Sequence, residues 1–319
     1  MISATNLIKL IRQQTENEDV SDFVGIQDDE FVQYLNDAQY NLQSTIVQQH
    51  PRAFMKEVIL DAVADQESYN IPSDCLLGNK VHNVEYSTTG DEEDYYVLTE
   101  DTIKSRTSGV TGSPSKYIRL AGKILLSPEP STSGKIRINY VQRVRQLDKR
   151  RAKVYSAPTI NSSGTWTMEL SYQDSTGGFF DTDKEDLEKE DYICIVDKLG
   201  ASVVKDIEIA ANGVSNTQLT LEAHTVDTKE GEANDSILAG HYVVGGKHTT
   251  THSDLDESVA RYLIAYCAWK ILKRDSSVDS TEALQEVQLM QAEIVKSYAM
   301  ISDDIQFIPV LSNWDDWSV

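Results

Sequence analysis

Apolar residues follow a helical three-four spacing at both ends of this chain and a strand-like spacing in the long region between them. This order predicts an α+β fold, in which the last helices complete a helical core begun by the first ones. With 319 residues, the chain is long enough for a main domain and a second, inserted one.

Two helices are predicted at the N-terminal end. The first spans residues 3–14, with Ser3 as its cap. The second begins at Asp28 with three acidic residues, where the helix dipole favours negative charge, and ends at His50-Pro51. Its apolar positions keep a helical spacing and are Phe31, Tyr34, Leu35, Ala38, Leu42 and Ile46.

Short runs bounded by turn residues follow Pro51 and indicate strands. They comprise residues 57–63, 80–86 and 95–98. We expect a hairpin in which residues 117–126 pair with residues 135–141 across a long loop. Further β-like runs, separated by Gly, Asn and Asp, predict an inserted all-β domain over residues 154–247. These runs are residues 165–170, 192–196, 202–209, 218–221 and 241–244.

Helical spacing returns at Ser253, the expected cap of one helix, and a last helix is expected from Asp279 with Glu282 in its first turn. The final segment has no periodicity, and its apolar residues need a partner surface. These docking candidates are Phe307, Ile308, Pro309, Val310, Leu311, Trp314 and Trp317. The predicted division is residues 1–153 for helices and hairpin, 154–247 for the insertion, 248–305 for the helices that complete the core, and 306–319 for an extended tail.

The formal net charge of -22 argues against sequence-independent binding of nucleic acid through its phosphates. An acidic surface nevertheless suits a channel through which DNA slides. Within residues 116–153 the balance is reversed. The candidate basic contacts there are Arg137, Arg143, Arg145, Lys149, Arg150, Arg151 and Lys153. They fit a solvated face, a contact to DNA phosphates, or a contact to an acidic neighbouring protein.

A complementary acidic run favours the last of these alternatives, because a ring is built from unlike patches that meet head to tail. The candidate acidic subunit contacts are Asp181, Asp183, Glu185, Asp186, Glu188, Glu190 and Asp191.

The common catalytic and cofactor signatures do not occur, so we expect no enzyme activity, no cofactor and no metal. His241, His248, His252 and Asp254 are the best metal candidates, but the threonines between two of the histidines disfavour a helix that would align them. We interpret Cys75, Cys194 and Cys267 as buried thiols in a reducing cytosol. We expect no export signal and no membrane span.

Two parts of the chain carry a family resemblance. Residues 29–39 include the phrase Leu35-Asn36-Asp37-Ala38, and residues 69–74 are followed by residues 125–128 and 136–140. Together with the late helices and the extended tail, they resemble head-to-tail adaptor proteins, also called connector or neck proteins, of tailed bacteriophages.

The resemblance implies a structural virion protein, made in the host cytoplasm, that forms a ring, usually of twelve subunits, in the neck between head and tail. The tail segment would reach into the portal protein, the β region would face tail or nozzle proteins, and double-stranded DNA would pass through during genome ejection.

Two other functions remain open from the sequence. A carbohydrate-binding virion protein would present the aromatic side chains of the insertion to a sugar; these are Trp166, Tyr172, Phe179 and Phe180. A polysaccharide hydrolase would use acidic residues of the β region.

Overall fold

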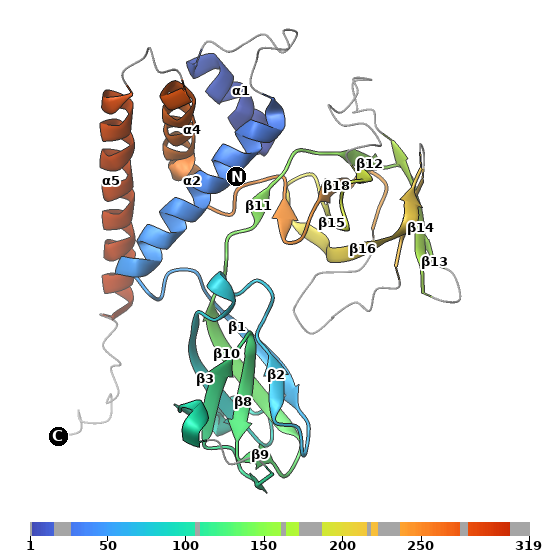
Figure 1. Cartoon of the computed structure of the whole chain (residues 1–319), viewed down its shortest axis with the longest axis vertical. Helices are drawn as coiled ribbons and strands as arrows, with labels where there is room; N and C mark the ends of the chain where they lie inside the picture. Colours follow the sequence, from blue (N-terminus) through green and yellow to red (C-terminus); the bar gives the residue numbers. More distant parts are fainter. Residues whose placement is uncertain are drawn as a thin grey trace, which may run out of the picture.

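The computed structural model describes residues 2–15, 27–105, 109–160, 164–171, 187–215, 218–222, 237–274 and 280–306. It is an α+β structure, as the sequence predicts. Figure 1 shows a helical unit, a β-sandwich below it and a β-barrel beside it.

The two ends of the chain build one helical core. The helices are α1 (Ala4–Gln14), α2 (Asp28–Gln49), α4 (Ala260–Arg274) and α5 (Thr281–Gln306). Ser3 caps α1 as predicted, since its hydroxyl accepts a hydrogen bond from the Asn6 amide at 3.3 Å. The largest fully buried side chains of this core are Leu7, Ile11, Phe31, Leu35, Leu42, Ile46 and Tyr262.

The predicted cap of α4 is wrong. The short helix η5 (Glu257–Val259) precedes α4, and the Asp256 carboxylate caps it by accepting from the Ser258 amide at 2.9 Å. The Ser253 hydroxyl instead donates to Gln39 Oε1 on α2 at 2.7 Å.

Two four-stranded sheets form the sandwich. One has the order β1-β10-β3-β4, with the ranges Met55–Ala62, Gly134–Val141, Val81–Ser87 and Tyr96–Val97. The other has the order β2-β8-β7-β5, with the ranges Ser68–Asn70, Lys123–Ser127, Lys116–Leu120 and Thr99–Glu100. Alternate side chains of both sheets share a core that includes Val84, Ile136, Ile138, Tyr117, Ile124 and Leu126.

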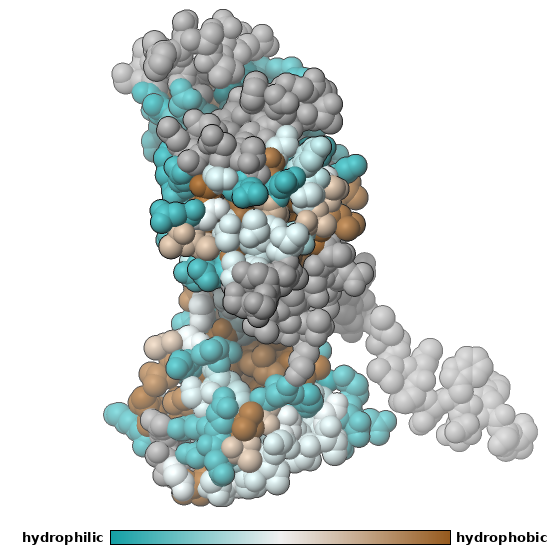
Figure 2. All heavy atoms as spheres, turned by 90° about the vertical axis from the view of Figure 1, so that its right-hand side faces the viewer, coloured by the Kyte–Doolittle hydropathy of each residue, from teal (hydrophilic) through white to brown (hydrophobic). Residues whose placement is uncertain are grey.

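Smaller elements complete the sandwich. They are η1 (Leu76–Gly78), η2 (Glu92–Asp94), η3 (Ile103–Ser105), and a parallel pair of β6 (Thr111–Gly112) and β9 (Glu129–Pro130). Brown apolar patches lie among teal and white residues on the lower part of the surface in Figure 2.

The predicted hairpin is also wrong. Residues 116–120 and 123–127 are two strands that pair with each other, because Ala121 and Gly122 form a tight turn with φ of 45° and 78°. Strand β10 pairs instead with β1 and β3 in the other sheet.

The barrel consists of one sheet with the order β12-β18-β15-β16-β17-β14-β13. Strand β12 also pairs with β14, so six of the strands close on themselves. The ranges are Ala152–Val154, Tyr242–Gly245, Tyr192–Val196, Ser202–Val214, Gln218–Leu221, Trp166–Ser171 and Thr159–Ile160. The five strands predicted in this region are confirmed.

Strands β11 (Gln146–Leu147) and β19 (Thr249–Thr250) form a short parallel pair beside the barrel. Among the described residues, no helix is long and apolar enough to cross a membrane.

Candidate functional site

The three units meet at residues 142–151, which we call the connecting segment. It leaves β10 of the sandwich, contacts α2, and enters the barrel at β12 through β11 (Figure 1). Its position makes it the point at which the relative placement of the units is fixed.

Three amide side chains on one face of α2, those of Asn36, Gln39 and Gln43, form hydrogen bonds to this segment. Asn36 donates to the Leu147 carbonyl at 2.9 Å and accepts from the Leu147 amide at 2.7 Å. Gln43 donates to the Gln142 carbonyl at 2.7 Å and accepts from the Val144 amide at 3.2 Å. Because Gln39 and Gln43 are fully buried, the helix supplies the partners that a neighbouring strand would otherwise provide.

Asp74 anchors the sandwich end of the segment. Its carboxylate accepts from the Tyr140 hydroxyl at 2.7 Å and the Gln142 amide group at 3.0 Å, and it lies 3.3 Å from Lys56 Nζ. Burial alone would raise the pKa of Asp74, but the Tyr140 hydrogen bond and the Lys56 charge outweigh burial and lower this pKa. The carboxylate therefore stays ionised, and Tyr140, Gln142 and Lys56 are its partners.

Ion pairs anchor the barrel end. Asp148 accepts from Arg151 Nε and from the Gly245 amide, both at 2.7 Å. Arg145 binds the Asp254 carboxylate at 2.6 Å and donates to Ser202 Oγ at 2.8 Å. These contacts are charge-assisted, and those to Gly245 and Ser202 bind the segment to β18 and β16 of the barrel.

A groove of about 440 Å³ opens beside the segment, and we call it the junction groove. It is lined by Phe54, Gln142, Arg143, Val144, Arg145, Ala201, Ser202, Lys205, His248 and Asp254.

The backbone around the junction groove is strained. Phe54 and His248 have φ of 60° and 57°, and Asp206, whose carboxylate accepts from the His248 amide at 2.6 Å, has φ of 53°. Non-glycine residues in this region cost about 1–3 kcal/mol each and cluster at functional sites. Burial lowers the pKa of His248 and favours its neutral form.

The junction groove is basic, since Arg143, Arg145 and Lys205 outnumber Asp254. Among the described residues, Arg143 has no carboxylate within ion-pair distance, and its Nε is shielded from solvent without a hydrogen-bond partner. No carboxylate of the described residues therefore pairs with its charge.

The predicted basic contacts do not form one patch. Arg137 lies on the outer face of the sandwich, where it pairs with Glu85 at 3.2 Å and stacks on the Tyr95 ring at 3.8 Å. The connecting segment holds Arg143, Arg145, Lys149, Arg150 and Arg151, while Lys153 lies in β12. Lys149 pairs with Asp29 at 3.1 Å, and Arg150 stacks on Tyr242 at 4.0 Å. Contacts of these residues to DNA or to another subunit stay predictions.

Only part of the acidic run lies in the described structure. Glu188, Glu190 and Asp191 lie just before β15, and Glu190 is 3.6 Å from Arg151 of the same chain. Asp181, Asp183, Glu185 and Asp186 lie outside the described residues. So do the docking candidates Phe307, Ile308, Pro309, Val310, Leu311, Trp314 and Trp317.

The histidines have separate local roles. The His241 Nδ1 accepts from the Leu238 amide at 3.1 Å, His248 Nε2 lies 3.2 Å from the Arg143 carbonyl, and His252 Nδ1 lies 2.8 Å from Thr251 Oγ1. No cluster of metal-binding side chains occurs among the residues that the structure describes.

The burial of the cysteines and of Trp166 bears on two further expectations. The three cysteines are free and buried, as predicted, and burial raises the pKa of Cys75 to about 11. Trp166 is 4% exposed in the barrel core, so it cannot stack on a sugar; Tyr172, Phe179 and Phe180 lie outside the described residues.

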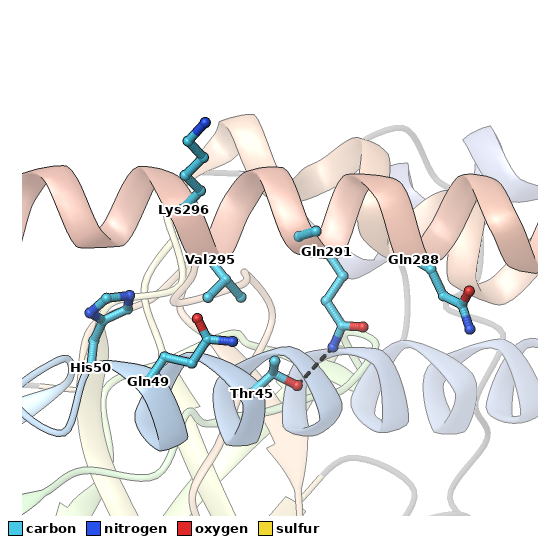
Figure 3. A pocket seen from close by; sticks show the side chains of 8 residues that line it. Thr45, Gln49, His50, Gln288, Gln291, Val295 and Lys296 are labelled. Carbon is cyan, nitrogen blue, oxygen red and sulfur yellow. Dashed lines mark hydrogen bonds between the residues drawn. The ribbon is translucent and has the colours of Figure 1, made fainter.

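A second groove, of about 410 Å³, lies between α2 and α5 (Figure 3). Gln291 of α5 donates to Thr45 of α2 at 2.8 Å across it, Val295 points toward α2, and Lys296 points away. Val295 is buried and most of the other lining side chains are polar, so this groove is a polar seam between two packed helices.

Sequence reasoning missed the amide face of α2. Asn36, Gln39 and Gln43 are spaced by three and four, between the apolar residues that mark the buried side. Polar side chains repeating at helical spacing next to a buried face were the available signal.

In the comparison with family models, the model of the SU10 adaptor protein matches residues 2–170. It covers α1, α2, the sandwich, the connecting segment and the first barrel strands, more than half of the 319 residues. None of the curated proteins matches the chain. Structural adaptors are not a class of enzymes, and their place in a phage suggests the virion. The chain belongs to the SU10 adaptor protein family and is a structural adaptor of a bacteriophage.

Proposed function

We propose that this adaptor forms a homo-oligomeric ring in the phage neck, joins the portal protein to the tail and extends the DNA channel. The observation that carries the proposal is the family match over residues 2–170, which includes the connecting segment and helix α2. A matched region that contains the connecting segment and its α2 partners is a scaffold able to hold separate binding surfaces in a fixed arrangement.

The surplus of negative charge supports the DNA channel. With a net charge of -22, the protein repels phosphate and would let DNA slide without trapping it. We further propose that residues 154–247 are an inserted domain facing tail or nozzle proteins, and that residues 306–319 dock on the portal.

The test is the mass of the purified protein, alone and mixed with its portal, by light scattering and negative-stain microscopy. We expect rings, alone or on the portal. An unrelated acidic protein of similar size serves as a control for charge-driven association. A protein that stays monomeric and ignores the portal would contradict the proposal.

A further inference from the structure

We propose that, within this ring, the junction groove of one copy receives an acidic turn of the next copy. The turn comprises residues 91–94, which include η2 and are separated from β4 by Tyr95. The inference rests on the proposed ring and names the surfaces that build it.

The junction groove has the chemistry to hold an anionic, partly apolar segment. Arg143 meets no carboxylate among the described residues, whereas the one acidic residue in the lining, Asp254, is already bound by Arg145. Phe54 lines the groove, and Leu199, which is 72% exposed, precedes its lining residue Ala201 by two positions. The groove therefore offers positive charge next to apolar surface.

The acidic turn has the complementary chemistry. Asp91, Glu92, Glu93 and Asp94 are all exposed. Glu92 pairs with Arg137 and Asp94 accepts from Thr89, which holds the turn in shape, while Glu93 has no partner among the described residues.

Exposed apolar residues flank the turn. Tyr96 and Val97 of β4 are 39% and 63% exposed. An acidic turn beside exposed apolar side chains is a surface that a basic, partly apolar groove could cover.

The two surfaces lie at opposite edges of one sheet. In the order β1-β10-β3-β4, Phe54 immediately precedes β1 and the acidic turn precedes β4. The two surfaces also lie toward opposite ends of the strands. Strand β1 begins opposite Val141, which is near the start of β3, whereas Tyr96 lies opposite Tyr86, near the end of β3. Unlike patches on opposite sides of a subunit give head-to-tail contacts, and these generate rings when the rotation closes.

Charge reversal tests the pairing in the full-length protein. Arg143→Glu, Lys205→Glu and Glu93→Arg should each weaken ring formation by at least about tenfold in protein concentration, as judged by light scattering. Combining Arg143→Glu with Glu93→Arg should restore rings, because the two charges then attract again. Lys123→Glu and Glu169→Arg, exposed positions elsewhere, should assemble like the wild type.

The thermal unfolding temperature of each variant shows whether a loss of rings results from a loss of folding. If Arg143→Glu destabilises the junction, Lys205→Glu still tests the charge of the groove. If wild-type protein forms rings and the single reversals do so equally well, the pairing is wrong while the proposed function stands. Single losses without recovery in the double variant also overturn it. Absence of wild-type rings, with or without portal, counts against the proposed function itself.

Discussion

At the scale of single residues, the junction depends on amide side chains that donate and accept at once. Asn36 and Gln43 each satisfy one backbone carbonyl and one backbone amide of the connecting segment. A hydroxyl or carboxylate could not do both with the same geometry. The cost of losing such a side chain is high because its backbone partners stay buried.

Gln43→Leu should lower the free energy of unfolding by about 2–4 kcal/mol, because the Gln142 carbonyl and the Val144 amide lose their partners. Gln48→Leu, at an exposed position of the same helix, should change it by less than about 0.5 kcal/mol. Urea unfolding of both variants measures the difference. Equal stabilities would show that the amide contacts contribute nothing.

His248 should make the stability depend on pH. Burial lowers its pKa from the ordinary value of 6.5, so below pH 6.5 the unfolded chain binds a proton that the folded protein resists. The free energy of unfolding therefore falls as the pH drops below 6.5, by up to about 1.4 kcal/mol per pH unit for this residue. Above pH 6.5 the contribution of His248 does not change with pH.

His248→Asn removes this dependence while keeping a residue type that tolerates the positive φ. Burial also lowers the pKa of His241 and of His252, so a smaller slope should remain in the variant. We expect parallel stability curves between pH 7.5 and 8.5 and a shallower fall for the variant between pH 6.5 and 5.5. Identical slopes in the acidic range would contradict the assignment to His248.

At the scale of elements, the sequence predicted what local patterns determine. The helix from Asp28 ends where His50-Pro51 predicts, and residues 192–196 and 218–221 are strands with the predicted bounds. Strand pairing was not determined, because alternation shows which face is buried and not which strand lies alongside. Residues 117–126 were predicted as one strand, although the turn at Ala121-Gly122 divides them into two.

The candidate site was less predictable for the same reason. Arg145 and Asp254 are 109 positions apart, and Gln43 and Gln142 are 99 apart, so no local pattern joins them. The basic residues were visible in the sequence, but Asp254 and Asp29, the carboxylate partners of Arg145 and Lys149, come from distant parts of the chain.

Substitutions in helix α5 measure how much its packing against α2 contributes to the free energy of unfolding. Of its side chains described, Val287 and Val295 are buried, whereas Leu289 is 68% exposed. Val295→Ala should lower the free energy of unfolding by about 1–2.5 kcal/mol through lost burial and the cavity left beside α2. Leu289→Ala, which removes a larger side chain, should cost less than about 0.5 kcal/mol in the isolated protein. The reverse order in urea unfolding would mean that α5 packs through another face.

At the scale of the whole molecule, the helical unit, the sandwich and the barrel each have a hydrophobic core, and the connecting segment contacts all three units. The helical core combines residues from both ends of the chain, so the strands of the sandwich and of the barrel both lie between its halves in sequence. Each unit can then present a surface of its own while the connecting segment fixes their arrangement. This arrangement suits a protein that binds several neighbours at once.

Deleting residues 306–319 tests the proposed division of labour between these surfaces. The deletion removes Phe307, Trp314 and Trp317 but leaves the residues of all three cores, so the truncated protein should unfold at nearly the wild-type temperature. It should no longer join the portal, because the apolar side chains proposed to become buried there are gone. Rings of the truncated protein should persist, since the junction groove and residues 91–94 are intact.

Co-sedimentation with portal measures the attachment, and light scattering of the truncated protein alone measures the ring. Trp314→Ala with Trp317→Ala, in the full-length chain, is the matched variant: it should weaken portal binding by at least about tenfold if the two indoles are anchors. Normal portal attachment by the truncated protein would remove the docking role of the tail. Loss of both ring and attachment would instead place the tail between subunits.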